Sequence, residues 1–137
     1  MKTQVEFYSD KFPPYDGEEE QINPGLWGKR LAEYLQQRLK ERGILTRDPV
    51  AEDWGWVLPV ENNSFDLWIG CGHQNGDDHE FLCFIEPSTP VIRRFFKKID
   101  TTDAVRRVAD AMNKILSSDL DIRNVRWSEK DGKTVSP

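Results

Sequence analysis

The sequence has 137 residues, of which 31% are charged and 37% are hydrophobic, and its net charge is −5. This length suits one domain with a core of its own, so we predict a single domain over residues 1–137. Two cysteines are too few for a disulfide framework, and no apolar run approaches the roughly 20 residues of a membrane-spanning helix. No signal peptide is visible, so we expect a cytoplasmic protein with no membrane partner.

The charge is distributed unevenly along the chain. Residues 48–92 contain nine acidic residues and no lysine or arginine, whereas residues 93–137 contain eleven basic and seven acidic residues. Two interpretations remain open. The acidic segment folds against the basic one and is neutralised by it, or it forms an acidic surface that attracts a basic partner.

The first elements follow from alternation, capping residues and helical spacing. Weak alternation of apolar and polar residues predicts a strand over residues 3–8, and a loop rich in Pro, Gly and Glu follows it. Asn23 followed by Pro24 is typical of a helix start, and Gly43 is typical of a helix end. We therefore predict a helix over residues 24–42.

Three strands are predicted in the acidic part of the chain, over residues 54–60, 65–72 and 79–86. The second and third strands each have one face that suits the core. These faces are formed by Phe65, Leu67, Ile69 and Cys71, and by Phe81, Cys83 and Ile85. If both faces point inward, a five-residue turn over 74–78 pairs Ile69 with Cys83, Cys71 with Phe81, and His73 with His79.

The last third of the chain is predicted to contain two helices and a strand. Thr89-Pro90 suggests a short helix over 90–98, with its hydrophobic side chains turned inward. An amphipathic pattern predicts a helix over 102–117, and residues 122–127 read as the last strand. Residues 128–137 are expected to fray.

The predicted element order is β-α-β-β-β-α-β. It favours an α+β fold with two layers. One layer is a mostly antiparallel sheet of about five strands, and the other contains two main helices packed on one face of that sheet.

Cys71, His73, His79 and Cys83 are the residue types that zinc prefers. Their spacing matches no zinc pattern, however, and the expected register places both cysteines in the core as small hydrophobic residues. Only His73 and His79 then meet, at the rim of the sheet, so they are weak metal candidates and we expect no cofactor. A Cys71–His73 nucleophile pair is an alternative, but no orienting group is visible.

The expected register also places Trp68 opposite Phe84 on the sheet face that points away from the core. One interpretation is that this pair reinforces the sheet, or is covered by residues 90–99. The other is that it forms an open binding surface, with Asp66 beside it.

The string Glu52-Asp53-Trp54-Gly55-Trp56 is the most unusual local feature. Tryptophans two residues apart on a strand point to the same side, and two acids precede them. Both indoles could belong to the core. Alternatively, Glu52, Asp53, Trp54 and Trp56 form an acidic, aromatic edge that holds Arg or Lys through charge and cation–π contacts.

Residues 93–98 form a basic and aromatic string, Arg-Arg-Phe-Phe-Lys-Lys, of a kind that can bind nucleic acid. The acidic net charge and the absence of a broad basic face argue against that function.

The Glu-Asp-Trp-Gly-Trp string in a small acidic chain resembles small uncharacterised bacterial proteins. The size and acidity are also similar to those of bacterial toxin-immunity proteins. This second resemblance implies a non-enzymatic inhibitor of a basic protein, and it carries over no functional residue.

Three hypotheses follow from the sequence. The first is a protein-binding module that uses Glu52, Asp53, Asp66 and the aromatic residues around them to engage a basic protein partner. The second is an enzyme or metal-dependent small-molecule binder at His73 and His79. The third is a homodimer formed through the aromatic sheet face.

Overall fold

The computed structural model describes residues 1–74 and 78–130. Its main feature is a six-stranded sheet with the order β2-β3-β4-β5-β1-β8, in which every neighbouring pair is antiparallel. The strands of this sheet are β1 (Lys2–Ser9), β2 (Val50–Glu52), β3 (Gly55–Val60), β4 (Leu67–His73), β5 (Glu80–Glu86) and β8 (Ile122–Glu129). A separate hairpin consists of β6 (Val91–Arg94) and β7 (Lys97–Asp100).

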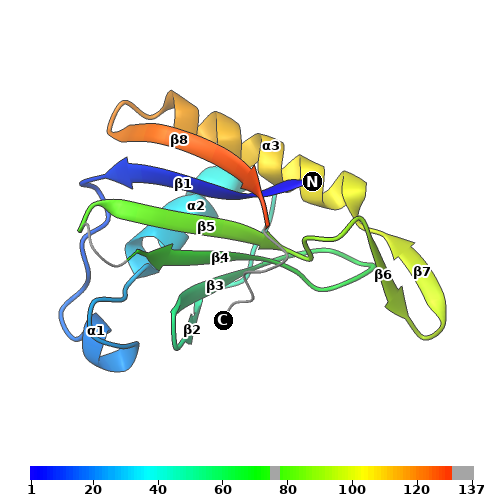
Figure 1. Ribbon diagram of the computed structural model, residues 1–137, viewed down its shortest axis with the longest axis horizontal. Coiled ribbons are helices and arrows are strands. Elements are labelled where there is room, and N and C mark those ends of the chain that lie inside the picture. Colours follow the sequence, from blue (N-terminus) through cyan, green and yellow to red (C-terminus); the bar gives the residue numbers. More distant parts are fainter. Residues whose placement is uncertain (75–77, 131–137) are drawn as a thin grey trace.

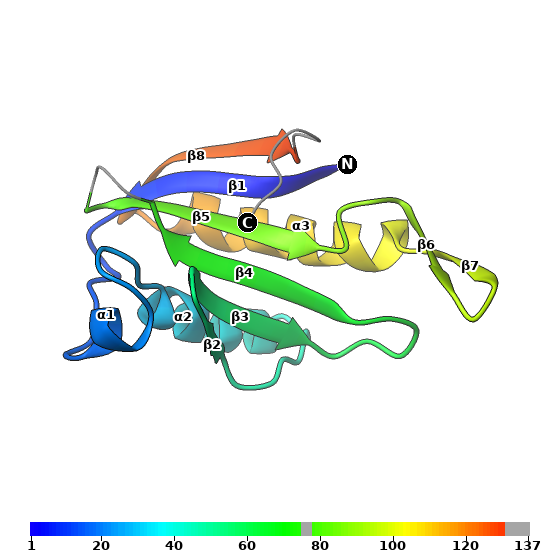
Figure 2. The ribbon, with the colours of Figure 1, turned by 60° about the horizontal axis from the view of Figure 1, so that its bottom comes forward.

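The helices are the short α1 (Glu18–Gln21), α2 (Lys29–Glu41) and α3 (Thr102–Ser118). α2 and α3 lie behind one face of the sheet, and in the part of the chain that the structure describes no helix lies on the other face (Figure 1). α2 packs against β3 and β4, whereas α3 packs against β8, β5 and β1 (Figure 2). The predicted two-layer α+β fold is confirmed. β2 and the β6–β7 hairpin were not predicted.

The core lies between the sheet and the two long helices. Alternate residues of β1, β4 and β5 are buried, including the core-facing sets predicted for the second and third strands. Each long helix contributes one stripe of buried hydrophobic side chains. The stripe of α3 contains Val105, Val108, Met112, Ile115 and Leu116. All these side chains belong to one hydrophobic cluster.

The pairing of β4 with β5 differs from the predicted register by two residues. Cys71 lies opposite Cys83, and His73 lies opposite Phe81 rather than His79. The predicted turn over residues 74–78 falls partly on residues 75–77, which lie outside the described residues. A shift of two residues leaves every side chain on its predicted face, because the side-chain period of a strand is two.

The predicted start of the first long helix at residue 24 was wrong, because α2 begins at Lys29. Residues 23–26 form a turn closed by a hydrogen bond from the Leu26 N–H to the Asn23 carbonyl, and Gly25 has a left-handed φ of 80°. The Asn23 side chain donates to the Asp53 carbonyl instead of capping a helix. The helix ends near Gly43, as predicted, and Gly43 has a left-handed φ.

The N-terminus of α2 is held by the carboxylate of Glu18, which is only 3% exposed. This carboxylate accepts hydrogen bonds from the backbone N–H groups of Gly28 at 2.8 Å and Lys29 at 2.9 Å. It also accepts from the Tyr15 N–H and from the indole N–H of Trp56, each at 2.9 Å. A negative charge at this position complements the helix dipole and caps α2 from outside the helix.

The predicted helix over residues 90–98 was also wrong. This segment is the β6–β7 hairpin, with Phe95 and Phe96 in its two-residue turn. Ile92 and Ile99 pack against the core as expected, but both phenylalanines are exposed to solvent. The helix that follows matches its prediction closely. β8 extends two residues beyond the predicted strand, and residues 131–137 of the predicted frayed end lie outside the described residues.

Within residues 1–74 and 78–130, no helix has the length and apolar character needed to cross a membrane.

Candidate functional site

Three aromatic rings gather on the sheet face that α2 and α3 leave uncovered. The ring of Trp54 stacks on that of Trp68, with 6.3 Å between centroids, and lies 5.2 Å from the ring of Phe84. Trp68 and Phe84 meet edge to face at 5.6 Å. We call Trp54, Trp68 and Phe84 the aromatic cluster. Each ring is half-buried by its neighbours.

A glycine beneath the cluster lets it pack closely on the sheet. Gly70 lies opposite Phe84 in the β4–β5 pairing. A Cβ atom at position 70 would lie only 2.3 Å from the Phe84 ring, so the ring rests directly on the glycine backbone. This arrangement holds Phe84 against both tryptophans, because no side chain at position 70 lifts its ring from the strand.

Trp56 does not join the cluster, and the expectation that it shares a face with Trp54 was wrong. Asp53 and Trp54 form the turn between β2 and β3, so Trp54 lies outside the alternation of the strand. Trp56 is on the core face and only 4% exposed. Its indole N–H bonds to Glu18, which gives it a structural position under α2.

Acidic side chains border the cluster. Glu52 and Asp53 are exposed at the β2–β3 turn, and Asp66 is exposed just before β4. In residues 1–74 and 78–130, none of these three carboxylates forms an ion pair. Glu52 and Asp53 directly precede Trp54, and Asp66 lies two residues before Trp68 at the other end of the β3–β4 pair, and none of the three is paired within the described residues.

The acids farther across the same face are neutralised. Arg126 of β8 lies 3.1 Å from Glu80 and 4.0 Å from Glu6, and Lys130 lies 2.9 Å from Glu86. The basic C-terminal region thus compensates acids on β1 and β5, while those near β2 and β4 keep their charge. Neutralisation of the acidic segment by the basic one therefore holds for Glu80 and Glu86. Attraction of a basic partner stays a prediction.

The residues of the second hypothesis lie apart from the cluster. Cys71 and Cys83 are free thiols and fully buried, and burial, followed by the interaction with the neighbouring Cys71 thiol, raises the pKa of the Cys83 thiol. His73 is 6% exposed and stacks on Trp27 at 3.7 Å. His79 is half-exposed and lies 3.1 Å from Asp10. The four predicted residues therefore form no common centre.

A hollow of about 500 Å³ does bring both histidines to one surface. Asp10, Glu19 and Trp27 also line it. The Nδ1 atom of His73 is 2.9 Å from the Gly25 carbonyl oxygen, which orients the imidazole in the wall. Among the described residues, no three His, Cys, Asp or Glu side chains are placed to hold a metal ion.

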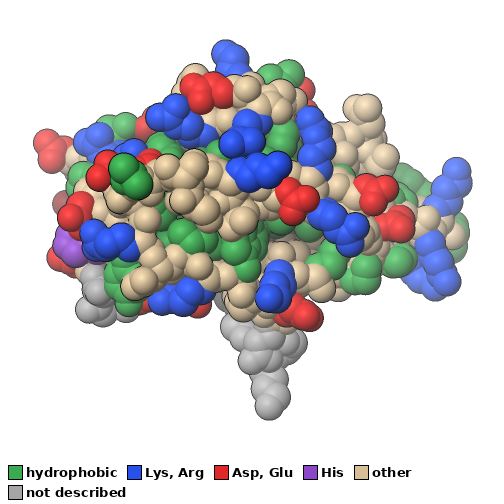
Figure 3. Space-filling view, turned by 90° about the horizontal axis from the view of Figure 1, so that it is seen from above, with side chains coloured by type: hydrophobic (Ala, Val, Ile, Leu, Met, Phe, Trp, Pro, Cys, Tyr) green, Lys and Arg blue, Asp and Glu red, His purple; other side chains and the backbone are tan. Residues whose placement is uncertain are grey.

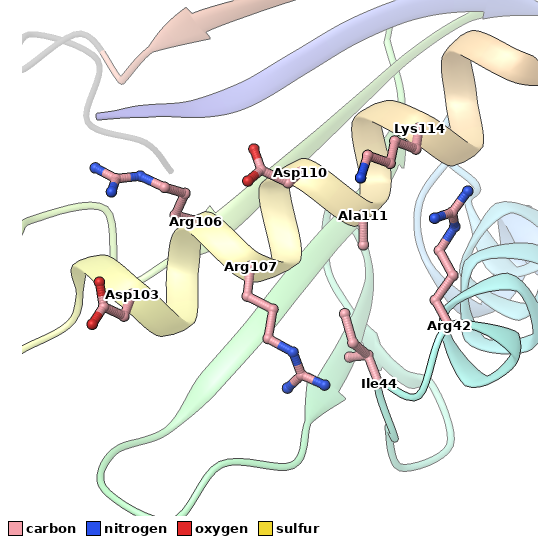
Figure 4. Close-up of a pocket in the computed structure, with 8 residues that line it drawn as sticks. All are labelled: Arg42, Ile44, Asp103, Arg106, Arg107, Asp110, Ala111 and Lys114. Atoms are coloured by element: carbon pink, nitrogen blue, oxygen red, sulfur yellow. The ribbon is translucent and has the colours of Figure 1, made fainter.

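A second hollow, of about 430 Å³, lies in the helical layer. Figure 4 shows Arg42, Arg107 and Lys114 reaching toward it from the end of α2 and from α3. Arg107 donates to the Gly43 carbonyl and so ties the two helices together. Asp103 and Asp110 share the rim, which makes the charge of this hollow mixed rather than uniformly basic.

Sequence reasoning placed Trp68 and Phe84 on this face from strand alternation, but their predicted direct pairing was wrong, because Trp68 pairs with Glu86 and Phe84 with Gly70. It found the three acids from composition. It did not place Trp54 beside them, because that contact depends on the short strand β2 and its turn. The stacking of His73 on Trp27 was also missed, because Trp27 was expected inside the helix predicted over residues 24–42.

Comparison of the chain with protein-family models, with curated proteins and with solved structures found no significant match, so its function has to be argued from its own residues.

Proposed function

We propose that this chain is a non-enzymatic protein-binding module whose aromatic cluster and adjoining acids engage a basic protein surface. One observation carries the proposal: three large rings lie on the sheet face that α2 and α3 leave uncovered, and the exposed carboxylates adjoining them in sequence, Glu52, Asp53 and Asp66, have no ion pair within the described residues. An inhibitor of the toxin-immunity type is one concrete form of such a module.

The two components would act differently in binding. Trp54, Trp68 and Phe84 are held together before any partner arrives, so little side-chain entropy is lost when they are covered. Aromatic rings at the centre of an interface contribute most of its affinity. Glu52, Asp53 and Asp66 lie at the edge of the cluster, where charges mainly set the association rate and the choice of a basic partner.

The test uses a panel of Arg- and Lys-rich peptides, with acidic peptides of matched length as controls, and reads binding from tryptophan fluorescence. We expect basic peptides to bind, and Asp66→Lys to weaken that binding by roughly tenfold at low salt. Asp110→Lys is the matched control, because it changes the net charge equally but lies in the helical layer. Trp68→Ala should lower the affinity by more than tenfold.

Several results would contradict this proposal. They are equal effects of Asp66→Lys and Asp110→Lys, unchanged affinity in Trp68→Ala, or no binding of any basic peptide. Light scattering on the same samples checks the homodimer. If the chain is a dimer that Trp68→Ala converts to a monomer, the cluster pairs with a second copy and not with a basic partner.

A second candidate function is a small-molecule or metal-ion site in the hollow beside His73 and His79. The observation in its favour is that this hollow gathers two imidazoles, Asp10 and Glu19. The melting temperature measured with Zn²⁺ and with chelator separates the two candidates. Under the first proposal we expect no change. A rise with Zn²⁺ that His79→Ala abolishes would support the second candidate.

A further inference from the structure

The β6–β7 hairpin projects from one end of the molecule (Figures 1 and 2). Its base is fixed to the body, since Ile92 and Ile99 pack against the core. The Thr101 N–H donates to the Pro90 carbonyl, and the Thr101 hydroxyl donates to the Thr89 carbonyl. The base is thus anchored while the opposite end of the hairpin extends outward.

The tip exposes two large apolar side chains. Phe95 is 83% exposed and Phe96 is 102% exposed, so neither is covered by the described part of the chain. Their φ angles are 51° and 67°, in the left-handed region that Asn and Gly adopt far more readily in a two-residue hairpin turn. Neither local conformation nor core packing accounts for phenylalanine at these two positions.

Basic residues surround this apolar tip on both sides. Arg94 pairs with Lys97, and Arg93 pairs with Lys98. Because successive residues of a strand point to opposite faces, one pair lies on each face of the hairpin. Figure 3 shows Lys and Arg side chains gathered at this end of the molecule. None of the four forms an ion pair within the described residues, and residues 87–99 contain no acid.

We propose that this hairpin tip docks onto an anionic lipid surface. Phe95 and Phe96 enter the boundary between headgroups and acyl chains, and the four cations contact the headgroup phosphates and carboxylates. An apolar tip with cations on both sides suits entry into a layer that is apolar inside and negatively charged at its surface. The contact is peripheral and does not require a spanning helix.

The arrangement favours a lipid surface over single-stranded nucleic acid. Binding of a strand requires a basic track along which successive phosphates lie, with rings spaced for successive bases. Here the basic residues are confined to the hairpin, and Phe95 and Phe96 are adjacent in its two-residue turn rather than spaced along a track. The β2–β3 turn, with Glu52 and Asp53, lies at the opposite end of the sheet (Figures 1 and 2). That distance limits repulsion between those acids and a negatively charged bilayer.

The experiment is co-sedimentation of the full chain with vesicles of phosphatidylcholine alone, or of phosphatidylcholine mixed with phosphatidylserine. We expect binding only to the mixed vesicles, and we expect it to weaken as salt is added. One tip supplies few apolar groups, so the affinity should be modest and reversible.

Two variants separate the contributions of rings and charge. Phe95→Asn with Phe96→Gly keeps all four cations and introduces residues that suit the turn, so the fold is retained. It should lose roughly tenfold or more in vesicle affinity. Lys97→Gln with Lys98→Gln keeps both rings and should lose roughly tenfold, together with much of the salt dependence.

Three results would overturn the proposal. They are equal binding to both kinds of vesicle, no binding to either, or unchanged binding when both phenylalanines are replaced. A single-stranded oligonucleotide is tested in parallel. If it binds through Phe95 and Phe96 while the vesicles do not, the hairpin is a nucleic-acid contact instead.

Discussion

Replacing Glu18 by glutamine should lower the free energy of unfolding by about 3 kcal/mol, because a buried carboxylate that accepts four hydrogen bonds loses its charge. Gly28, Lys29, Trp56 and Tyr15 supply the four N–H donors. The glutamine amide would direct its own N–H groups at one or more of these donors. The α2 N-terminus would also lose the negative charge that complements the helix dipole.

Urea unfolding, followed by circular dichroism, measures this loss. Glu20→Gln is the matched control, because Glu20 lies in the same short helix but is exposed, and we expect a change within about 0.5 kcal/mol. Trp56→Phe removes the indole donor together with part of a buried ring system. Because both variants break the same hydrogen bond, combining it with Glu18→Gln should give less than the sum of the single effects. Similar losses for Glu18→Gln and Glu20→Gln would show that the carboxylate does not hold α2.

The hydrophobic pattern predicted which face of each strand is buried, but it could not determine the register between β4 and β5. Registers that differ by two residues place Cys71 and Cys83 on the same core face and differ only in their partners. Side-chain period therefore cannot distinguish them. The number of residues in the connecting turn determines the register, and the sequence indicates that number only approximately.

The errors at the two helices have a different cause. Asn23-Pro24 is a sound local capping signal, yet α2 is capped by Glu18, whose carboxylate comes from a separate segment of the chain. The helix predicted over 90–98 rested on the start signal Thr89-Pro90 and would have turned Phe95 and Phe96 inward, whereas the structure exposes both. Local signals give way to tertiary contacts in the first case. In the second case, the apolar character of the two phenylalanines was taken as evidence of burial. Buried residues are mostly apolar, but an apolar residue is not always buried.

The candidate site could be predicted only in part, for the same reasons. Trp68 and Phe84 follow from alternation within regular strands, so their outward direction was predictable. Trp54 belongs to a turn, where alternation has no meaning, and its contacts with the other two rings depend on how β3 pairs with β4. Composition located the acids, but their lack of ion pairs within the described residues depends on where Arg126 and Lys130 lie in space.

Gly28→Ala should lower the free energy of unfolding by about 3 kcal/mol or more, through steric conflict with the central strand β4. A Cβ atom at position 28 would lie 2.4 Å from the Cys71 carbonyl oxygen and 2.9 Å from its carbon. These are backbone atoms of a paired strand and cannot move as a flexible side chain does. The φ of Gly28 is 177°, outside the left-handed region, and the predicted loss is argued from the contact with Cys71.

Gly43→Ala provides the matched control, because its effect on stability is conformational, whereas that of Gly28→Ala is steric. Position 43 has a left-handed φ of 81° and no atom within 4 Å of an added Cβ, so alanine should cost only about 1 kcal/mol there. Urea unfolding of both variants compares a steric effect with a conformational one. If Gly28→Ala costs no more than Gly43→Ala, α2 can move away from β4 without loss. The close approach of Gly28 to Cys71 would then not be what positions the helix on the sheet.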